Sequence, residues 1–397
     1  MTTNYLTELD RFSQKYILRG TNRFTKEDKM LFLHKFDAAK ASVFESLLLH
    51  ETTNFRVTGE NIPLNILIVE AGIKGLEELI EQNGLAFTHW TNDVMSFVNP
   101  IEGVIPISPA TYNSKTHTDP EESISSALNM LADQPNKRDK RLIIRKTRDL
   151  YSYPPDDLAT DAVTLATSAF NSNKFHALGL DSTKCEITNL SAHQVSLLAE
   201  CCNELLQYKF LASSKFTTSD STFTHKIFLD CTQKIKNSDI SEAFSKILML
   251  ENFPKTQDIY QYTDSPIRKS IKLRNNKNVI RFRTWLHEAL TQHEIEEITK
   301  AYLDAITSKK GFLASNTGKF TKTVFMASAG ALVGAALGPI AMAAGGVVGS
   351  LLAPAGDLAF DLVDEYYLSN LLSGWSPRMV FDDLRSLGIR IEPTLGS

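Results

Sequence analysis

Arginine side chains repeat at helical spacing in residues 137–148, KRDKRLIIRKTR, where they could bind phosphate groups. The basic residues of this first basic cluster are Lys137, Arg138, Lys140, Arg141, Arg145, Lys146 and Arg148. If the segment is helical, its four arginines fall at i, i+3, i+7 and i+10, close to one face. Because a planar guanidinium grips phosphate in two places, this face predicts an anion-binding surface. The alternative is a solvated face or an ion-pair surface between subunits.

A second basic cluster occupies residues 268–283, RKSIKLRNNKNVIRFR, and no acidic residue occurs between Asp264 and Glu288. Its basic residues are Arg268, Lys269, Lys272, Arg274, Lys277, Arg281 and Arg283. The net charge of the chain is −4, so any attraction for nucleic acid or anionic lipid must be local. Aromatic residues are scarce in both clusters, so we expect phosphate contact rather than base stacking.

A glycine-rich run without charged side chains extends from Val324 to Gly356. Gly330, Gly334 and Gly338 are spaced four apart, and Gly345 and Gly349 repeat the spacing. On helices, this spacing lets two backbones pack closely in lipid.

The length of this run, 33 residues, would give a helix of about 50 Å, which exceeds the hydrocarbon core of about 30 Å. Pro339 divides the run, so a membrane hairpin is favoured, with a kinked single span as the alternative. A buried hairpin in the core of a soluble oligomer is the alternative without a membrane.

Three carboxylates follow the glycine-rich run at helical spacing. Asp357, Asp361 and Asp364 lie at i, i+4 and i+7 and would share one helix face. In a symmetric oligomer, such a face would form acidic rings that attract cations at a pore mouth. The alternative is the wet face of an amphipathic helix.

Signatures of common enzymes are missing from the sequence. It has no phosphate-binding P-loop, no GxSxG nucleophile elbow and no HExxH zinc motif. The four cysteines lack metal-ligand spacing, and adjacent Cys201 and Cys202 fall in a predicted helix. We therefore expect reduced cysteines, a cytoplasmic protein that associates with the inner membrane, no metal, no cofactor and no catalytic function.

The elements that would position these residues are mainly helical. Residues 26–50 carry apolar side chains at helical spacing, and Pro63 opens a second helix that ends before Gly84. Further predicted helices are 120–133, 155–171, 191–211 and 284–308, and the predicted strands lie in 54–63, 85–90 and 103–108. We predict a small α/β N-terminal unit (1–115), a helical body with both basic clusters (116–310) and a C-terminal glycine-rich hairpin with an acidic helix and tail (311–397).

The segment GALVGAALGPIAMAAGGVVG and the two basic clusters resemble features of membrane-acting effectors of bacterial anti-phage defence, with the Hailong system as the nearest named case. In that system, single-stranded DNA oligomers made by a partner nucleotidyltransferase hold an ion-channel effector inactive. The segment is also similar to the hydrophobic hairpin of pore-forming colicins. The resemblance implies inner-membrane lipids, a second copy of the chain, a single-stranded oligonucleotide and a nucleotidyltransferase as partners.

We therefore expect a homo-oligomeric membrane effector that conducts ions or disrupts the bilayer, held in check by an anionic ligand at the basic clusters. Two other classes of function stay open. One is a soluble regulatory or scaffold oligomer packed through the glycine-rich hairpin, and the other is an enzyme with an unrecognised site. Recovery of the protein in the membrane fraction would favour the effector over the soluble scaffold.

The glycine spacing predicts that Gly334→Leu abolishes toxicity on overexpression while the body stays folded, because a leucine would keep the helices apart. Ala336→Leu, which adds the same side chain away from the glycine face, should remain toxic. Cell viability after induction measures both variants. Undiminished toxicity of a well-expressed Gly334→Leu variant would show that close glycine packing is not required.

Overall fold

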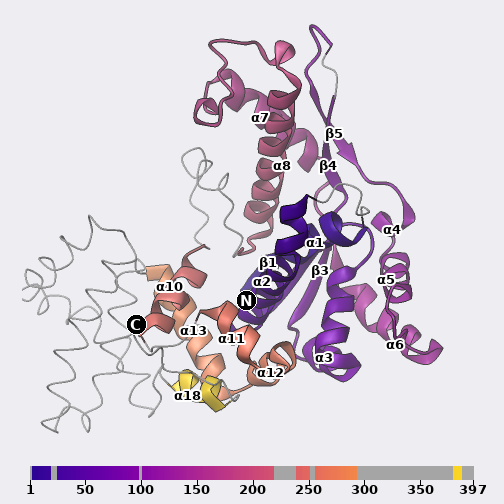
Figure 1. The fold of residues 1–397 in the computed structure, drawn as a ribbon, viewed down its shortest axis with the longest axis vertical. Coiled ribbons are helices and arrows are strands. Elements are labelled where there is room, and N and C mark those ends of the chain that lie inside the picture. Colours follow the sequence, from indigo (N-terminus) through magenta and orange to yellow (C-terminus); the bar gives the residue numbers. More distant parts are fainter. Residues whose placement is uncertain are drawn as a thin grey trace, which may run out of the picture. The chain divides into compact units, whose positions relative to one another are not determined.

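In a computed structural model, the chain is mainly helical and has a small parallel sheet near its N-terminus, in agreement with the predicted fold class (Figure 1). The described residues are 2–18, 25–97, 101–218, 238–250, 255–292 and 379–386. The chain divides into two compact units, residues 1–238 with 264–274 and residues 239–263 with 275–397. Within the described ranges, no helix combines the length and apolar character needed to cross a bilayer.

Strands and helices of the first unit alternate along its N-terminal part. The strands are β1 (Thr3–Leu6), β2 (Thr52–Val57), β3 (Leu85–His89), β4 (Asn92–Ser96), β5 (Ile107–Thr111) and β6 (Tyr151–Ser152). The helices are α1 (Glu8–Ser13), α2 (Lys26–Leu49), α3 (Ile62–Glu81), α4 (Lys115–Thr118), α5 (Pro120–Asn129), α6 (Lys137–Thr147), α7 (Leu158–Asn171), α8 (Ala192–Ser214) and α12 (Pro266–Leu273). Short 3-10 and π-helical turns join some of them.

Four strands form one parallel sheet in the order β1-β2-β3-β6. Phe55 of β2 is aligned with Leu6 and with Phe87, and Phe87 is aligned with Tyr151. Both phenylalanines are fully buried, as expected for a parallel sheet that is covered by other elements. Because all four strands run in the same direction, their carboxyl ends meet at one edge of the sheet.

The helices α2 and α3 make the return connections that parallel strands need, and both lie along the sheet (Figure 1). Thr25 and Asp28 form a reciprocal capping box at the start of α2. Asn61 caps α3 by accepting a hydrogen bond from the N–H of Leu64, and Pro63 occupies its first turn. The predicted helix that opens at Pro63 is thus present as α3.

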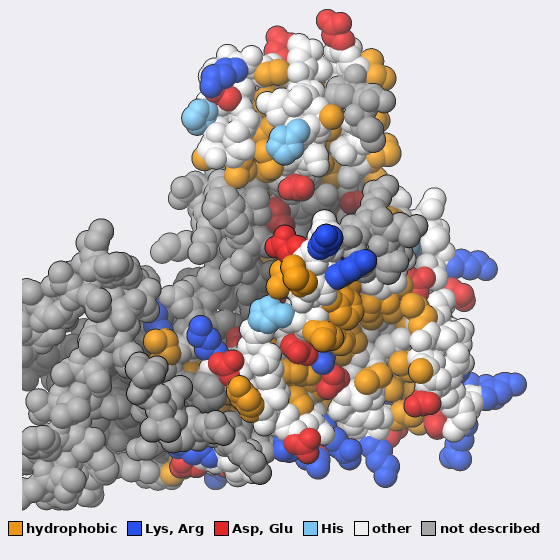
Figure 2. Space-filling view, viewed as in Figure 1, with side chains coloured by type: hydrophobic (Ala, Val, Ile, Leu, Met, Phe, Trp, Pro, Cys, Tyr) orange, Lys and Arg blue, Asp and Glu red, His pale blue; other side chains and the backbone are white. Residues whose placement is uncertain are grey.

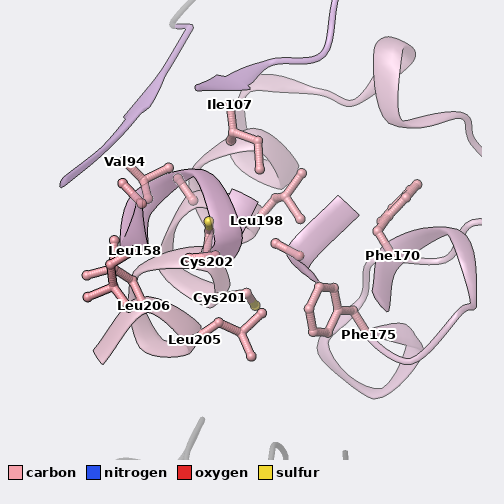
Figure 3. Close-up of a cluster of buried hydrophobic side chains, with 14 of the residues drawn as sticks. Val94, Ile107, Leu158, Phe170, Phe175, Leu198, Cys201, Cys202, Leu205 and Leu206 are labelled. Carbon is pink, nitrogen blue, oxygen red and sulfur yellow. The ribbon is translucent and has the colours of Figure 1, made fainter. Parts of the chain in front are cut away.

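The β4–β5 hairpin packs with α7 and α8 around a second apolar core (Figure 3). Val94 and Ile107 of the hairpin point toward side chains of α7 and α8, among them Leu198. Cys201 and Cys202 are fully buried there, and burial raises the pKa of each thiol to about 12. These two cysteines are free thiols, as predicted, and their high pKa keeps them protonated and unreactive at neutral pH.

Arg274 fixes α12 to the first unit although the helix lies far along the chain. Its side chain is buried and donates hydrogen bonds to the carbonyl oxygens of Leu47 (2.8 Å), His50 (2.9 Å) and Glu51. Its Nε also donates to Gln82 Oε1 at 3.1 Å. The guanidinium therefore satisfies carbonyl groups at the C-terminal end of α2, which a helix cannot satisfy by itself.

The second unit is helical in its described part. Its helices are α10 (Ser238–Leu250), α11 (Thr256–Tyr262), α13 (Lys277–Gln292) and α18 (Met379–Ser386). Buried rings form its core: Phe282 lies edge-on to Phe244 and Phe381, with centroid distances of 6.1 and 6.0 Å. A hydrogen bond from Asn278 to Asp383 (3.0 Å) also joins α13 to α18.

We expect Arg274→Met to lower the free energy of unfolding by at least about 2–3 kcal/mol, because several buried carbonyl groups lose a charged donor. Arg268→Met is the matched control, since Arg268 is exposed on the same helix and has no side-chain partner in the described part of the chain. Its effect should stay within about 0.5 kcal/mol. Urea denaturation followed by circular dichroism measures both variants, and equal losses would contradict the anchoring role of Arg274.

Candidate functional site

Residues 137–147 of the first basic cluster form α6, which meets the condition for a shared arginine face, and Asn136 caps the start of this helix. The Asn136 side chain accepts hydrogen bonds from the N–H groups of Arg138 and Asp139, at 2.9 and 3.0 Å. Ile143 and Thr147 point into the unit and are buried. Lys and Arg side chains project into solvent around the place that α6 occupies in Figure 1 (Figure 2). The hydrophobic contacts of one face therefore orient the arginines of the other toward solvent.

Some cations of the first basic cluster are engaged within the protein. Lys146 pairs with Glu77 of α3 at 2.8 Å, and Arg148 pairs with Glu121 of α5. Lys140 donates hydrogen bonds to amide side chains, at distances of 2.7 and 3.0 Å. These contacts attach α6 to its neighbours, and they remove Arg148 from the face available to a ligand.

The other four cations of the first basic cluster are exposed and have no side-chain partner among the described residues. They are Lys137, Arg138, Arg141 and Arg145. The three arginines follow one face at steps of three and four residues, so they are about 4.5 and 6 Å apart along the helix axis. We call these three residues the arginine row. The row presents guanidinium groups that no carboxylate of the described chain neutralises.

The second basic cluster is divided between the two units. Arg268 and Lys272 are exposed on α12 of the first unit, whereas Arg274 is buried on backbone carbonyls. Lys277, Arg281 and Arg283 belong to α13 of the second unit, and Arg283 is buried. The described part of the chain therefore gives this cluster no continuous cationic surface within one unit.

The predicted packing glycines and pore-mouth residues lie outside the described residues. They are Gly330, Gly334, Gly338, Gly345, Gly349, Asp357, Asp361 and Asp364. Their roles stay predictions. Among the described residues, no group of histidine, cysteine and acidic side chains could hold a metal ion.

A second concentration of charged groups lies at the carboxyl edge of the parallel sheet, where ligands commonly bind in α/β proteins. Asp10 of α1 is buried, and its Oδ2 is 3.0 Å from Arg56 Nε. The N–H and hydroxyl groups of Thr58 both donate to the same carboxylate at 2.9 Å. Burial raises the pKa of Asp10, while Arg56 and Thr58 oppose the shift.

Two histidines lie at the same edge. His89, the last residue of β3, is fully buried, and its Nε2 is 2.9 Å from the carbonyl oxygen of Thr116. That nitrogen must carry the proton, because a carbonyl oxygen only accepts. His117 lies against Gly59, and its Nδ1 is 2.6 Å from Ser114 Oγ. Burial lowers the pKa of both histidines, so both are mostly neutral at neutral pH.

No motif in the sequence points to this edge. Arg56 and His89 each stand within a predicted strand, and the positions that follow a strand are those that line the carboxyl edge. Asp10 lies 46 residues before Arg56 and meets it only when β1 and β2 pair. The sequence therefore indicates the strands that carry Arg56 and His89, but nothing in it indicates that Asp10 meets Arg56. Comparison with protein-family models, curated proteins and solved structures finds no match for this chain.

His89, which is buried, and His117, which is partly buried, make stability depend on pH. Their pKa in the folded protein is lower than the ordinary value of 6.5, so the unfolded chain binds protons more readily. The stability that they contribute is complete above the ordinary pKa and is lost as the pH falls through the folded pKa. We expect the urea concentration at the unfolding midpoint to be lower at about pH 5 than at about pH 7.

His89→Gln should reduce this fall, because glutamine can donate to Thr116 without titrating. His193→Gln is the control, since His193 is exposed at the start of α8. Urea denaturation at both pH values gives the change for each variant. Identical pH dependence in the wild type and His89→Gln would exclude His89 as a contributor.

Proposed function

We propose that this protein is a homo-oligomeric membrane effector, which conducts ions or disrupts the bilayer and is held in check by an anionic ligand. The observation that carries the regulatory part is the arginine row on α6, which is exposed and has no counter-ion in the described part of the chain. The glycine-rich run supports the membrane part on its sequence alone. The protein would be cytoplasmic and would associate with the inner membrane, in anti-phage defence.

A single-stranded oligonucleotide is the ligand class that we propose for the arginine row. Guanidinium groups bind phosphates through paired hydrogen bonds, and a row of them matches a ligand that repeats phosphates. No aromatic side chain interrupts the segment 137–148, so the contact would be with the backbone of the strand and independent of its base sequence. A nucleotidyltransferase partner would supply such a strand.

Control by this ligand requires it to bind the inactive state more tightly than the active one, because equal affinity for both states shifts nothing. The first unit would bind the ligand, and residues 324–356 would enter the membrane after its release. Because Lys146 of α6 and Arg148, the residue after Thr147, pair with Glu77 of α3 and Glu121 of α5, a ligand on α6 would act on the folded unit as a whole.

The affinity of the wild type for a short single-stranded oligonucleotide should fall as salt rises. The logarithmic slope should be about two to three, because each neutralised phosphate of a single strand contributes about 0.7. Replacing Arg138, Arg141 and Arg145 with Glu should weaken binding at least about tenfold, at about 0.5–1 kcal/mol for each exposed contact. Fluorescence anisotropy with a labelled oligonucleotide measures both quantities.

The matched control replaces Lys26, Lys29 and Lys174 with Glu. These lysines are exposed and have no side-chain partner among the described residues, and the change in net charge is the same. The control should keep most of the affinity. Dye release from liposomes should then be inhibited by oligonucleotide in the wild type and in the control, but not in the arginine variant.

Two outcomes would contradict the proposal in different ways. If both triple variants bound the oligonucleotide equally weakly, the arginine row would act only through its net charge. Oligonucleotide binding without dye release under any condition would favour the soluble regulatory oligomer, and it would leave the arginine row as its ligand site.

A further inference from the structure

We propose that the carboxyl edge of the parallel sheet is a second ligand site, where Arg56 binds the phosphate or carboxylate group of a small molecule. This site shares no residue with the arginine row and does not depend on the membrane function. Its ligand is a small oxyanion, whereas the arginine row is a linear surface for a repeating anion.

Arg56 is held in place on two sides. Its Nε is 3.0 Å from Asp10 Oδ2, and its guanidinium carbon lies 4.5 Å from the centroid of the Trp90 ring. Trp90 is itself buried, so the ring is a fixed platform. An arginine that is already ordered loses little conformational freedom when it binds a ligand.

The outer end of Arg56 is free to bind. Its side chain is 21% exposed, and neither terminal nitrogen makes a hydrogen bond to the described part of the chain. Arg274 shows what a purely structural arginine looks like in the same protein: it is only 3% exposed, and Nε, Nη1 and Nη2 all donate. Arg56 uses one edge for the fold and leaves the other edge unused.

The loop that follows Arg56 adds further donors. Gly59 has a φ of +83°, and the main-chain N–H groups of Gly59 and Glu60 donate no hydrogen bond within the described residues. Successive free N–H groups next to a left-handed residue are typical of anion-binding loops. The His117 ring lies so close that a Cβ on Gly59 would be 3.2 Å from its Cε1.

His117 also retains an unused group. Its Nδ1 is held by Ser114, and its Nε2 makes no hydrogen bond to any described residue. The ring lies against Gly59, the residue after Thr58, whose hydroxyl donates to Asp10, so His117 belongs to the same loop cluster as the ion pair. The edge therefore combines a fixed guanidinium, two main-chain donors and an imidazole.

The charge balance explains why the ligand should be a single oxyanion rather than a polyanion. Asp10 neutralises Arg56 in the folded protein, and Glu60 places a second carboxylate in the loop that follows Arg56. A highly charged ligand would be repelled by both carboxylates. A phosphate or a carboxylate can instead take paired hydrogen bonds from the free edge of the guanidinium.

The test titrates the full-length protein with inorganic phosphate, AMP and acetate in separate calorimetric experiments. Arg56→Lys keeps the charge beside Asp10 but removes the planar fork, so it should weaken binding of the responding ligand at least about tenfold. His117→Gln should weaken it less. Arg385→Lys on α18, whose side chain pairs with Asp382 and belongs to neither proposed site, is the matched control and should bind as the wild type does.

The three probes distinguish the sources of the oxyanion. Binding of inorganic phosphate or AMP with no response to acetate assigns a phosphate ligand, and the reverse assigns a carboxylate. If Arg56→Lys fails to fold, as its urea transition would show, ¹⁵N resonances of the wild-type arginine Nε–H groups report the contact instead, with His117→Gln as the variant. Absence of binding by all three probes, or equal binding by wild type and Arg56→Lys, would overturn the proposal and leave the arginine row unaffected.

Discussion

Parallel pairing of β1, β2, β3 and β6 is the constraint on which the first unit depends, because it places every carboxyl end at one edge. Each parallel pair needs a return connection, and α2 and α3 supply two of them while covering the sheet. The loops at this edge bring Thr58 to the Asp10 carboxylate and place the His117 ring against Gly59. A buried carboxylate is costly unless it is paired, and Asp10 meets Arg56 and Thr58 only because these loops converge.

The same kind of side chain serves three purposes in this unit, and its surroundings decide which. Arg274 is buried and donates its hydrogen bonds to carbonyl groups, so it stabilises the fold. Arg56 is held by Asp10 and the Trp90 ring, and its terminal nitrogens donate no hydrogen bond within the described residues. The arginine row is solvated and unpaired, which costs the fold little and leaves its charge available for a ligand. Counting basic residues cannot separate these cases, whereas burial and hydrogen-bond saturation can.

The sequence predicted the elements that carry their own signals. Pro63 marks the start of α3 in the sequence, and α7 and α8 repeat apolar residues at helical spacing. The strands β1 and β6 are four and two residues long, too short for a pattern to emerge. The surroundings of Arg274 could not be predicted either, because the carbonyl groups that it binds lie more than 220 residues away along the chain. The edge site depends on the same long-range pairing.

Magnitudes limit how an anionic ligand could restrain the proposed membrane segment. Twelve residues of the run are Val, Leu, Ile, Phe or Met, and they favour insertion by about 4–7 kcal/mol in total. A ligand present at a hundred times its dissociation constant stabilises the state that it binds by about 2.7 kcal/mol. Ligand binding at one site is therefore too weak to hold back the segment alone. In the proposed effector, the inactive state would also have to shelter the apolar run, through subunit packing or a second ligand.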